Sequence, residues 1–143
     1  MKQQVSPRTA AIIASSLPLM ERNRTSIEAM LDARMREDGG DRDVPAPIAA
    51  AMVRMLIDHA RRIEPDGTLF AIDGYARHHA RLAISAEDHG RAANSLPEAL
   101  RAVLDHEATP AIVGAWTVLL QVLTVLVAGG TRAVSAGPMA MPD

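Results

Sequence analysis

The sequence predicts an all-α domain. Composition is the first reason: 48% of the 143 residues are hydrophobic, yet only 2% are aromatic. A core of Ala, Leu, Ile, Val and eight Met residues favours helices, because Ala, Leu and Met are good helix formers and sheets prefer aromatic and β-branched residues. Periodicity is the second reason, since apolar residues recur every three to four positions between Gly- and Pro-rich breaks. We expect about six helices in one domain.

Capping and breaker residues delimit the first three helices. Ser6 followed by Pro7 is typical of a helix start, and a second helix is expected over about 26–36. The stretch DGGDRDVPAP, residues 38–47, ends that helix because its glycines and prolines do not continue one. A third helix follows over about 48–63 and stops at the turn sequence EPDG. The apolar residues expected to face the core are Ile12, Ile13, Leu17, Met20, Ile27, Met30, Leu31, Met35, Ala51, Met52, Met55 and Leu56.

Three more helices are expected in the second half of the chain. A fourth spans about 69–82, and Ser85 with Asp88 has the form of a capping box that starts a fifth. Pro97 should kink or split the fifth helix, because proline removes a backbone donor and clashes with the preceding turn. The last helix runs from about Pro110 to Ala128. We therefore expect a domain over residues 1–130 and a flexible tail over 131–143, which is rich in Gly, Ala and Pro.

Charge and residue types argue against several classes of function. The 15 basic and 17 acidic side chains give a formal charge of −2 without a basic block, so nucleic acid is not an expected partner. The chain has no cysteine, and its first ten residues lack the continuous apolar core of a secretory signal, which favours a cytoplasmic location. No phosphate-binding loop surrounds the sole lysine, Lys2. Asp58 and His59 are expected to form an exposed pair with no nucleophile beside it.

The final helix has two interpretations. Residues 109–131 carry no charge, which is long enough for a membrane span. The same segment has a small and polar stripe beside its apolar one, formed by Gly114, Thr117, Gln121, Thr124 and Ala128. This amphipathicity favours a buried helix of a globular bundle, with no membrane partner. The uncharged outer stripe makes the last two helices a candidate homodimer contact.

Two adjacent histidines in YARHHARLAI, residues 75–84, are the leading candidates for a binding site. Neighbouring positions on a helix point about 100° apart, so both imidazoles cannot face the core. His79 shares a stripe with Leu69 and Leu82 and should point inward, whereas His78 should point outward. A histidine on an apolar stripe is more often a hydrogen-bonded core residue than a metal ligand, so the pattern leaves both roles open.

Two long stretches carry a resemblance to known proteins. The run SPRTAAIIASSLPLMERNRTSIEAM is followed by HHARLAISAEDHGRAANSLPEALRAVLDHEATPAIVGAWTVLLQVL, with Thr-Pro and Ala-Trp landmarks that end at Pro110 and Trp116. Over about residues 5–130 these resemble the first two and last three helices of bacterial single-domain haemoglobins and of the globin domain of flavohaemoglobins. The resemblance implies a globin-like fold with a shortened region between the second and third helices. It also implies haem b as cofactor, with His79 as the proximal iron ligand.

The resemblance implies the surroundings of that cofactor as well. A distal wall is expected from Met30, Leu31, Ala51, Met52 and Met55, and further cofactor contacts are expected from Tyr75, His78, Arg81, His89 and Trp116. His78 and Arg81 either form a solvated rim or pair with a haem propionate. His89 is either a surface residue or hydrogen-bonds His79 and sets its tautomer. Met52 and Met55 are either core filler or a source of a second axial ligand.

The chain departs from the family pattern at the positions that tune ligand binding. Leu31 stands in place of the distal tyrosine and Pro47 at or near the distal glutamine. The segment after the second helix, residues 38–47, contains no aromatic residue that could stack on the porphyrin. His89 and Thr131 replace the tyrosine and glutamate that brace the proximal histidine. A polar distal donor would stabilise bound dioxygen by about 1.5–3 kcal/mol, or roughly one to two decades of affinity. Without it, carbon monoxide and nitric oxide should bind better than dioxygen.

Three functions fit this sequence, in the following order. The first is a haem protein that binds a diatomic ligand, O2, NO or CO, or acts in sensing or redox chemistry. The second is a haem-dependent enzyme with an open apolar distal pocket for a small organic or peroxide substrate, supplied with electrons by an external reductase. The third is a haem-free globin-like regulatory or interaction module. The missing stacking aromatic favours this third function, and the retained His79 opposes it.

Overall fold

The computed structural model describes residues 5–38, 47–69 and 84–136. Within these ranges it contains the α-helices α1 (Pro7–Arg22), α2 (Arg24–Asp38), α3 (Pro47–Arg62), α5 (Ala86–Leu104) and α6 (Pro110–Ala136), and the short 3-10 helix η1 (Asp105–Glu107). No β-strand occurs in the described ranges. The predicted all-α fold is therefore confirmed. The predicted fourth helix, about 69–82, lies almost entirely outside the described residues.

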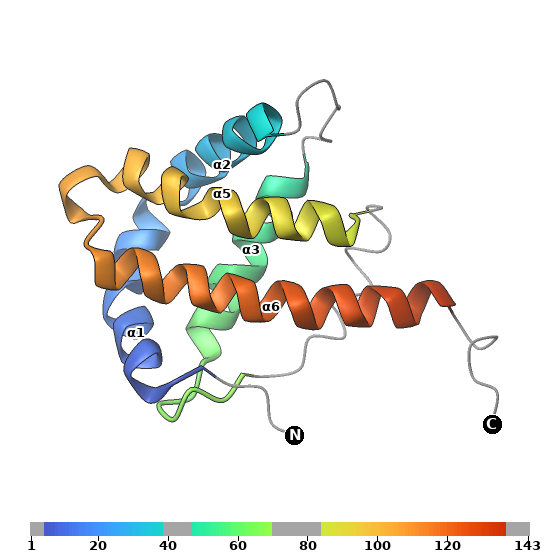
Figure 1. The fold of residues 1–143 in the computed structure, drawn as a ribbon. Helices are drawn as coiled ribbons and strands as arrows, with labels where there is room; N and C mark the ends of the chain where they lie inside the picture. Colours follow the sequence, from blue (N-terminus) through green and yellow to red (C-terminus); the bar gives the residue numbers. More distant parts are fainter. Residues whose placement is uncertain (1–4, 39–46, 70–83, 137–143) are drawn as a thin grey trace.

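The helices surround one continuous core. α5 and α6 lie side by side and run in opposite directions, and α1 and α3 cross them steeply (Figure 1). α2 packs against both α5 and α3, while α1 packs against α6 and α3. Buried apolar side chains from all five α-helices belong to a single cluster. The inner faces predicted for the first three helices are the faces that enter this core.

The two predicted helix starts are confirmed by their caps. The Ser6 hydroxyl accepts the backbone N–H of Thr9 at 3.0 Å. At α5, the Ser85 hydroxyl accepts the N–H of Asp88, and the Asp88 carboxylate accepts the N–H of Ser85, each at 3.0 Å. Each of these bonds satisfies a donor that the first turn of a helix would otherwise leave unpaired.

Two helices continue past residues that were expected to interrupt them. Pro97, where a kink or a split was expected, lies inside α5; the helix is not split there and continues to Leu104. Leu96 and Leu100, on either side of Pro97, are both 0% exposed, and their burial offsets the lost backbone hydrogen bond. α6 ends at Ala136 rather than near Ala128, so the helix runs past two glycines that were expected to stop it. Each glycine in a helix interior costs roughly 1 kcal/mol relative to alanine, so this extension is formed against its local preference.

The turn after α3 depends on a glycine. Gly67 has φ +92°, and its carbonyl accepts the N–H of Val5 at 3.0 Å. A Cβ at Gly67 would lie 1.9 Å from the Val5 carbonyl oxygen, so no other residue fits without movement of the backbone. The contact joins this turn to the residues that precede α1.

Part of the apolar composition of α6 is explained by side chains that are buried in the core. Its window Pro110–Val127 is long and apolar enough to cross a membrane by length and composition, a criterion that core helices also meet. In this window Trp116, Leu119, Leu120 and Leu123 are all 0% exposed. These residues pack in the core that α6 shares with α1, α3 and α5. The packing agrees with the expected buried helix.

Candidate functional site

The five predicted distal residues lie on two helices that pack against each other. Leu31 on α2 and Met52 and Met55 on α3 are 0% exposed, and Ala51 is 7% exposed. Met30 is partly buried against the same core. All five side chains are uncharged and none carries a hydrogen-bond donor. This distal wall offers apolar and thioether contacts only.

Only three titratable side chains are buried in the part of the chain that the structure describes: His59, Asp88 and His89. The Asp88 carboxylate is used by the α5 cap and by Arg91, whose guanidinium lies 3.4 Å away. Asp88 therefore stabilises the start of α5. The protonation and hydrogen bonding of the two buried histidines are described next in turn.

His89 is held in one orientation by the start of α5. Its Nδ1 lies 2.8 Å from the carbonyl oxygen of Ser85, and the residue is 1% exposed. A carbonyl only accepts, so Nδ1 must carry the hydrogen and the neutral ring keeps its lone pair on Nε2. Burial lowers the pKa of His89, although the hydrogen bond to Ser85 and the charge of Asp88 oppose the shift. The structure thus places a neutral imidazole with an acceptor nitrogen inside the protein, and the expected alternative of a surface histidine is wrong.

His59 was expected to be exposed, and this expectation is wrong. The residue is 0% exposed on α3, and its Nδ1 lies 2.9 Å from the Met55 carbonyl oxygen. Burial lowers its pKa, opposed by the Met55 hydrogen bond and the charge of Asp58 and assisted by that of Arg62. The signal that would have placed it correctly is its spacing from Met52 and Met55, because residues three to four apart share one helix face.

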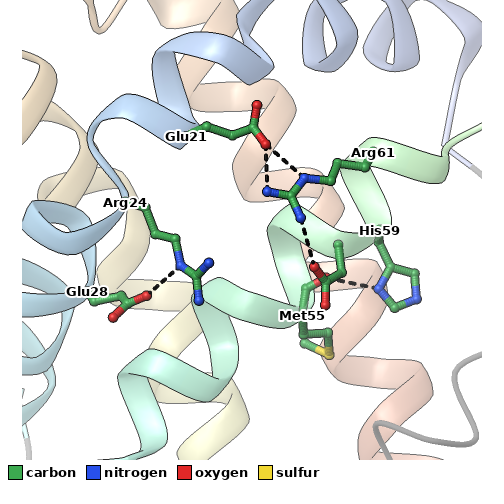
Figure 2. Close-up of polar contacts among 7 residues, drawn as sticks. Glu21, Arg24, Glu28, Met55, His59 and Arg61 are labelled. Atoms are coloured by element: carbon green, nitrogen blue, oxygen red, sulfur yellow. Dashed lines mark hydrogen bonds and ion pairs between the residues drawn. The ribbon is translucent and has the colours of Figure 1, made fainter.

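The neighbouring polar side chains of α3 serve a different purpose. Arg61 reaches Glu21 of α1, with 2.6 Å between its Nη2 and the carboxylate, and Figure 2 shows the His59 ring pointing away from this ion pair. Arg24 and Glu28 form a second ion pair at 2.9 Å, within α2 (Figure 2). Exposed pairs of this kind contribute about 0–1 kcal/mol each, so neither pair is a main source of stability. Only the Arg61–Glu21 pair connects two helices, α3 and α1.

Trp116, counted among the possible cofactor contacts, has a partner in the protein. It is 0% exposed, and its indole N–H donates to the Ser16 hydroxyl at 2.8 Å, joining residues 100 positions apart. The Ser16 hydroxyl in turn donates to the Ile12 carbonyl at 2.6 Å. Sequence reasoning missed Ser16, because a buried serine within a helix carries no local signal of a distant donor. The contact gives Trp116 a role in holding α6 to α1; its contact with a cofactor stays a prediction.

The proximal half of the predicted site lies outside the described residues. His79, His78, Tyr75 and Arg81 all fall within 70–83. In the described ranges no group of three or more His, Cys, Asp or Glu side chains lies together as an all-protein metal site would require. The described part of the site is therefore the distal wall and His89.

The fold matches that of a solved structure. This is an engineered carbene transferase, a putative nitric oxide dioxygenase from Rhodothermus marinus, with a TM-score of 0.70, 23% sequence identity, and coverage of 92% of this chain and 96% of the other. No protein-family model matches the sequence, and a search of curated proteins gives no match. At this identity the likeness shows the fold and not the activity. The chain thus has a globin-like fold, as its segment order predicted.

Proposed function

We propose that this chain binds haem b with His79 as the axial iron ligand and that its distal wall favours carbon monoxide and nitric oxide over dioxygen. The observation that carries the proposal is the distal wall: in a globin-like fold, the buried side chains of Leu31, Met52 and Met55 contain no polar donor. The proposal places the protein in the cytoplasm, with electrons supplied by a separate reductase.

The described residues suit a haem by their chemistry. A porphyrin needs apolar side chains against its faces, and the distal wall is built from Leu, Ala and Met alone. No buried carboxylate lies among them that would require a counter-charge, since Asp88 is engaged at the α5 cap. When bound, haem would supply an iron centre that takes up a diatomic ligand or changes its oxidation state.

His89 supports this proposal from a second position. An axial histidine is usually oriented by a hydrogen bond from its non-coordinating N–H to a nearby acceptor. His89 offers such an acceptor, because the Ser85 carbonyl binds its Nδ1–H and the lone pair stays on Nε2. The lowered pKa keeps the ring neutral near pH 7. In this proposal Nε2 of His89 accepts the Nδ1–H of His79 and fixes its tautomer.

The distal wall sets the expected ligand preference. Dioxygen gains from a polar donor because its bound form carries partial negative charge, and a hydrogen bond to a charged group contributes about 1.5–3 kcal/mol. The wall gives no such bond, so dioxygen affinity should be lower by roughly one to two decades than with a donor present. Carbon monoxide depends less on that bond. A thioether from Met52 or Met55 remains the candidate sixth ligand for an electron-transfer role.

An absorption titration with haem tests the proposal. We expect the wild type to take up one haem per chain with a Soret band, His79→Ala to lose or strongly shift that band, and His78→Ala to keep it. Carbon monoxide added after reduction should shift the band if the sixth position is open, and should fail to do so if a methionine occupies it. A wild type that takes up no stoichiometric haem would refute the proposal.

A haem-free regulatory or interaction module is the second candidate, and one observation favours it. Leu31, Met52 and Met55 leave no exposed surface, so they are already in full contact with protein atoms. The same titration separates the two candidates, because a haem-free module would show no uptake at any haem concentration. If haem is taken up, the description of the matched structure makes consumption of nitric oxide with an external reductant the first activity to assay.

A further inference from the structure

One face of α6 is uncharged, largely apolar and exposed to solvent. We call it the α6 stripe and define it as Ala111, Gly114, Val118, Gln121 and Val125, the exposed positions from 111 to 127. Val118 is 41% exposed and Val125 is 72% exposed, and they are the only large hydrophobic side chains exposed in the described ranges. Covering an apolar side chain as exposed as Val125 with another surface lowers the free energy, because apolar surface is removed from water.

The spacing of the stripe fits a helical partner. Its members follow one another at intervals of three, four, three and four residues. This is the spacing of the contact positions in a two-helix coiled coil, where such a seam meets a second helix with the same repeat. Gly114 lies within the seam, and a Cβ built there would meet nothing within 4 Å. A second helix can therefore approach α6 closely at this point.

The absence of charge on α6 indicates which helix can pack against it. The exposed face of every other described α-helix carries charged residues, for example Arg8 on α1, Glu37 on α2, Arg54 on α3 and Arg101 on α5. α6 carries none between Pro110 and Val127. A patch that meets its own copy about a two-fold axis must be compatible with itself, and an uncharged seam satisfies this condition without any complementary charge. A helix bound at a lipid surface would instead be expected to have Lys or Arg beside its apolar face.

We propose that the α6 stripe is the contact between two copies of this chain, which pack α6 against α6 about a two-fold axis. This proposal does not depend on haem. The segment from Ala111 to Val125 spans about 21 Å, and with a helix width of about 10 Å it covers a few hundred Å² per partner. Interfaces this small belong to the weak class, below roughly 1,200 Å² in total. Because interfaces of about 1,600 Å² already extend into the micromolar range, a smaller contact should have a dissociation constant in the micromolar range or higher.

Sedimentation velocity from 5 to 500 µM tests the proposal with three variants. The wild type should shift from the mass of one chain, 15.3 kDa, towards twice that mass as concentration rises. Val125→Glu places two carboxylates in one seam and should weaken association at least tenfold. Gly114→Glu should weaken it as well, because it also places a charge in the seam, while its own fold keeps room for the new side chain. Ala14→Glu on the exposed face of α1 is the matched control and should associate as the wild type does.

The outcomes are distinct. Association that is lost in Val125→Glu and Gly114→Glu but kept in Ala14→Glu, with all variants folded by circular dichroism, supports the two-fold contact. A wild type that stays at the mass of one chain at 500 µM overturns it, as does a dimer that both α6 variants leave unchanged. A monomer that instead co-floats with vesicles of phosphatidylcholine and phosphatidylglycerol overturns it in favour of a lipid partner.

Discussion

The hydrogen bond between Trp116 and Ser16 predicts a specific loss of stability. Ser16→Ala removes the acceptor of a fully buried indole N–H, and an unsatisfied buried donor costs about 1–3 kcal/mol. Alanine is the better helix former by about 0.5 kcal/mol, which offsets part of that cost. The net loss in the free energy of unfolding should be about 0.5–2.5 kcal/mol. For a domain of this size, the melting temperature should fall by about 3–4 °C for each kcal/mol.

Ser15→Ala is a matched control in the same helix. The Ser15 hydroxyl also donates to the Ile12 carbonyl, at 3.0 Å, but it is exposed and bonds no indole. Urea unfolding followed by circular dichroism, which also reads variants without the tryptophan, should show Ser15→Ala at or slightly above wild-type stability and Ser16→Ala below it. In a Trp116→Phe background no indole donor remains, so Ser16→Ala should cost nothing. Equal effects of Ser16→Ala in both backgrounds would refute the reasoning.

Three further predictions concern the buried histidines, the turn after α3 and the distal wall. Burial lowers the folded-state pKa of His59 and His89, so below about pH 6.5 the unfolded chain binds more protons than the folded protein. The free energy of unfolding should therefore decrease as the pH is lowered through this range. Urea midpoints that stay constant from pH 7.5 to 5 would contradict this. Gly67→Ala should lower the free energy of unfolding by about 1–3 kcal/mol, because φ +92° and the nearby Val5 carbonyl exclude a Cβ. Thermal melting measures this loss, and an unchanged melting temperature would count against the described turn. In haem-loaded protein, Leu31→Gln adds an amide donor and should raise dioxygen affinity by roughly one to two decades over wild type, while changing carbon monoxide affinity less. Equal gains in affinity for both gases would contradict the argument from the missing distal donor.

Local signals made much of the fold predictable. Ser6 and the Ser85–Asp88 pair fix two helix starts through short contacts between near neighbours, so the sequence contains all the information needed. Helix ends are less local. The continuation of α5 through Pro97 and of α6 to Ala136 depends on how much burial and propagation offset an unfavourable residue, and no single position reports that balance.

The site was predictable only in part, and the physical reason differs between residues. Spacing placed Leu31, Met52 and Met55 in the interior, because burial follows the helical period. The same rule applied to His59 would have placed it inside, but its polarity and its charged neighbours favoured the surface interpretation. A histidine whose Nδ1 bonds the carbonyl four residues earlier can be buried at low cost. The choice between surface and core is thus made by a backbone hydrogen bond that forms only once the helix is present.

α6 shows why periodicity identifies faces but not partners. Hydropathy along this helix is equally consistent with a membrane span, a core helix and a contact between copies, and the structure resolves one face by burying Trp116, Leu119 and Leu123. The opposite face, with Val118 and Val125, is exposed, so the two faces should be separable by mutation. Ser16→Ala acts on the buried face and should lower the melting temperature without changing the concentration at which the chain dimerises. Val125→Glu acts on the exposed face and should weaken dimerisation. The monomer's free energy of unfolding, measured in urea at low micromolar concentration, should stay within about 0.5 kcal/mol of wild type. If either variant altered both properties to the same extent, the two faces of α6 would not be independent, and the exposed stripe would have to be part of what holds the fold together.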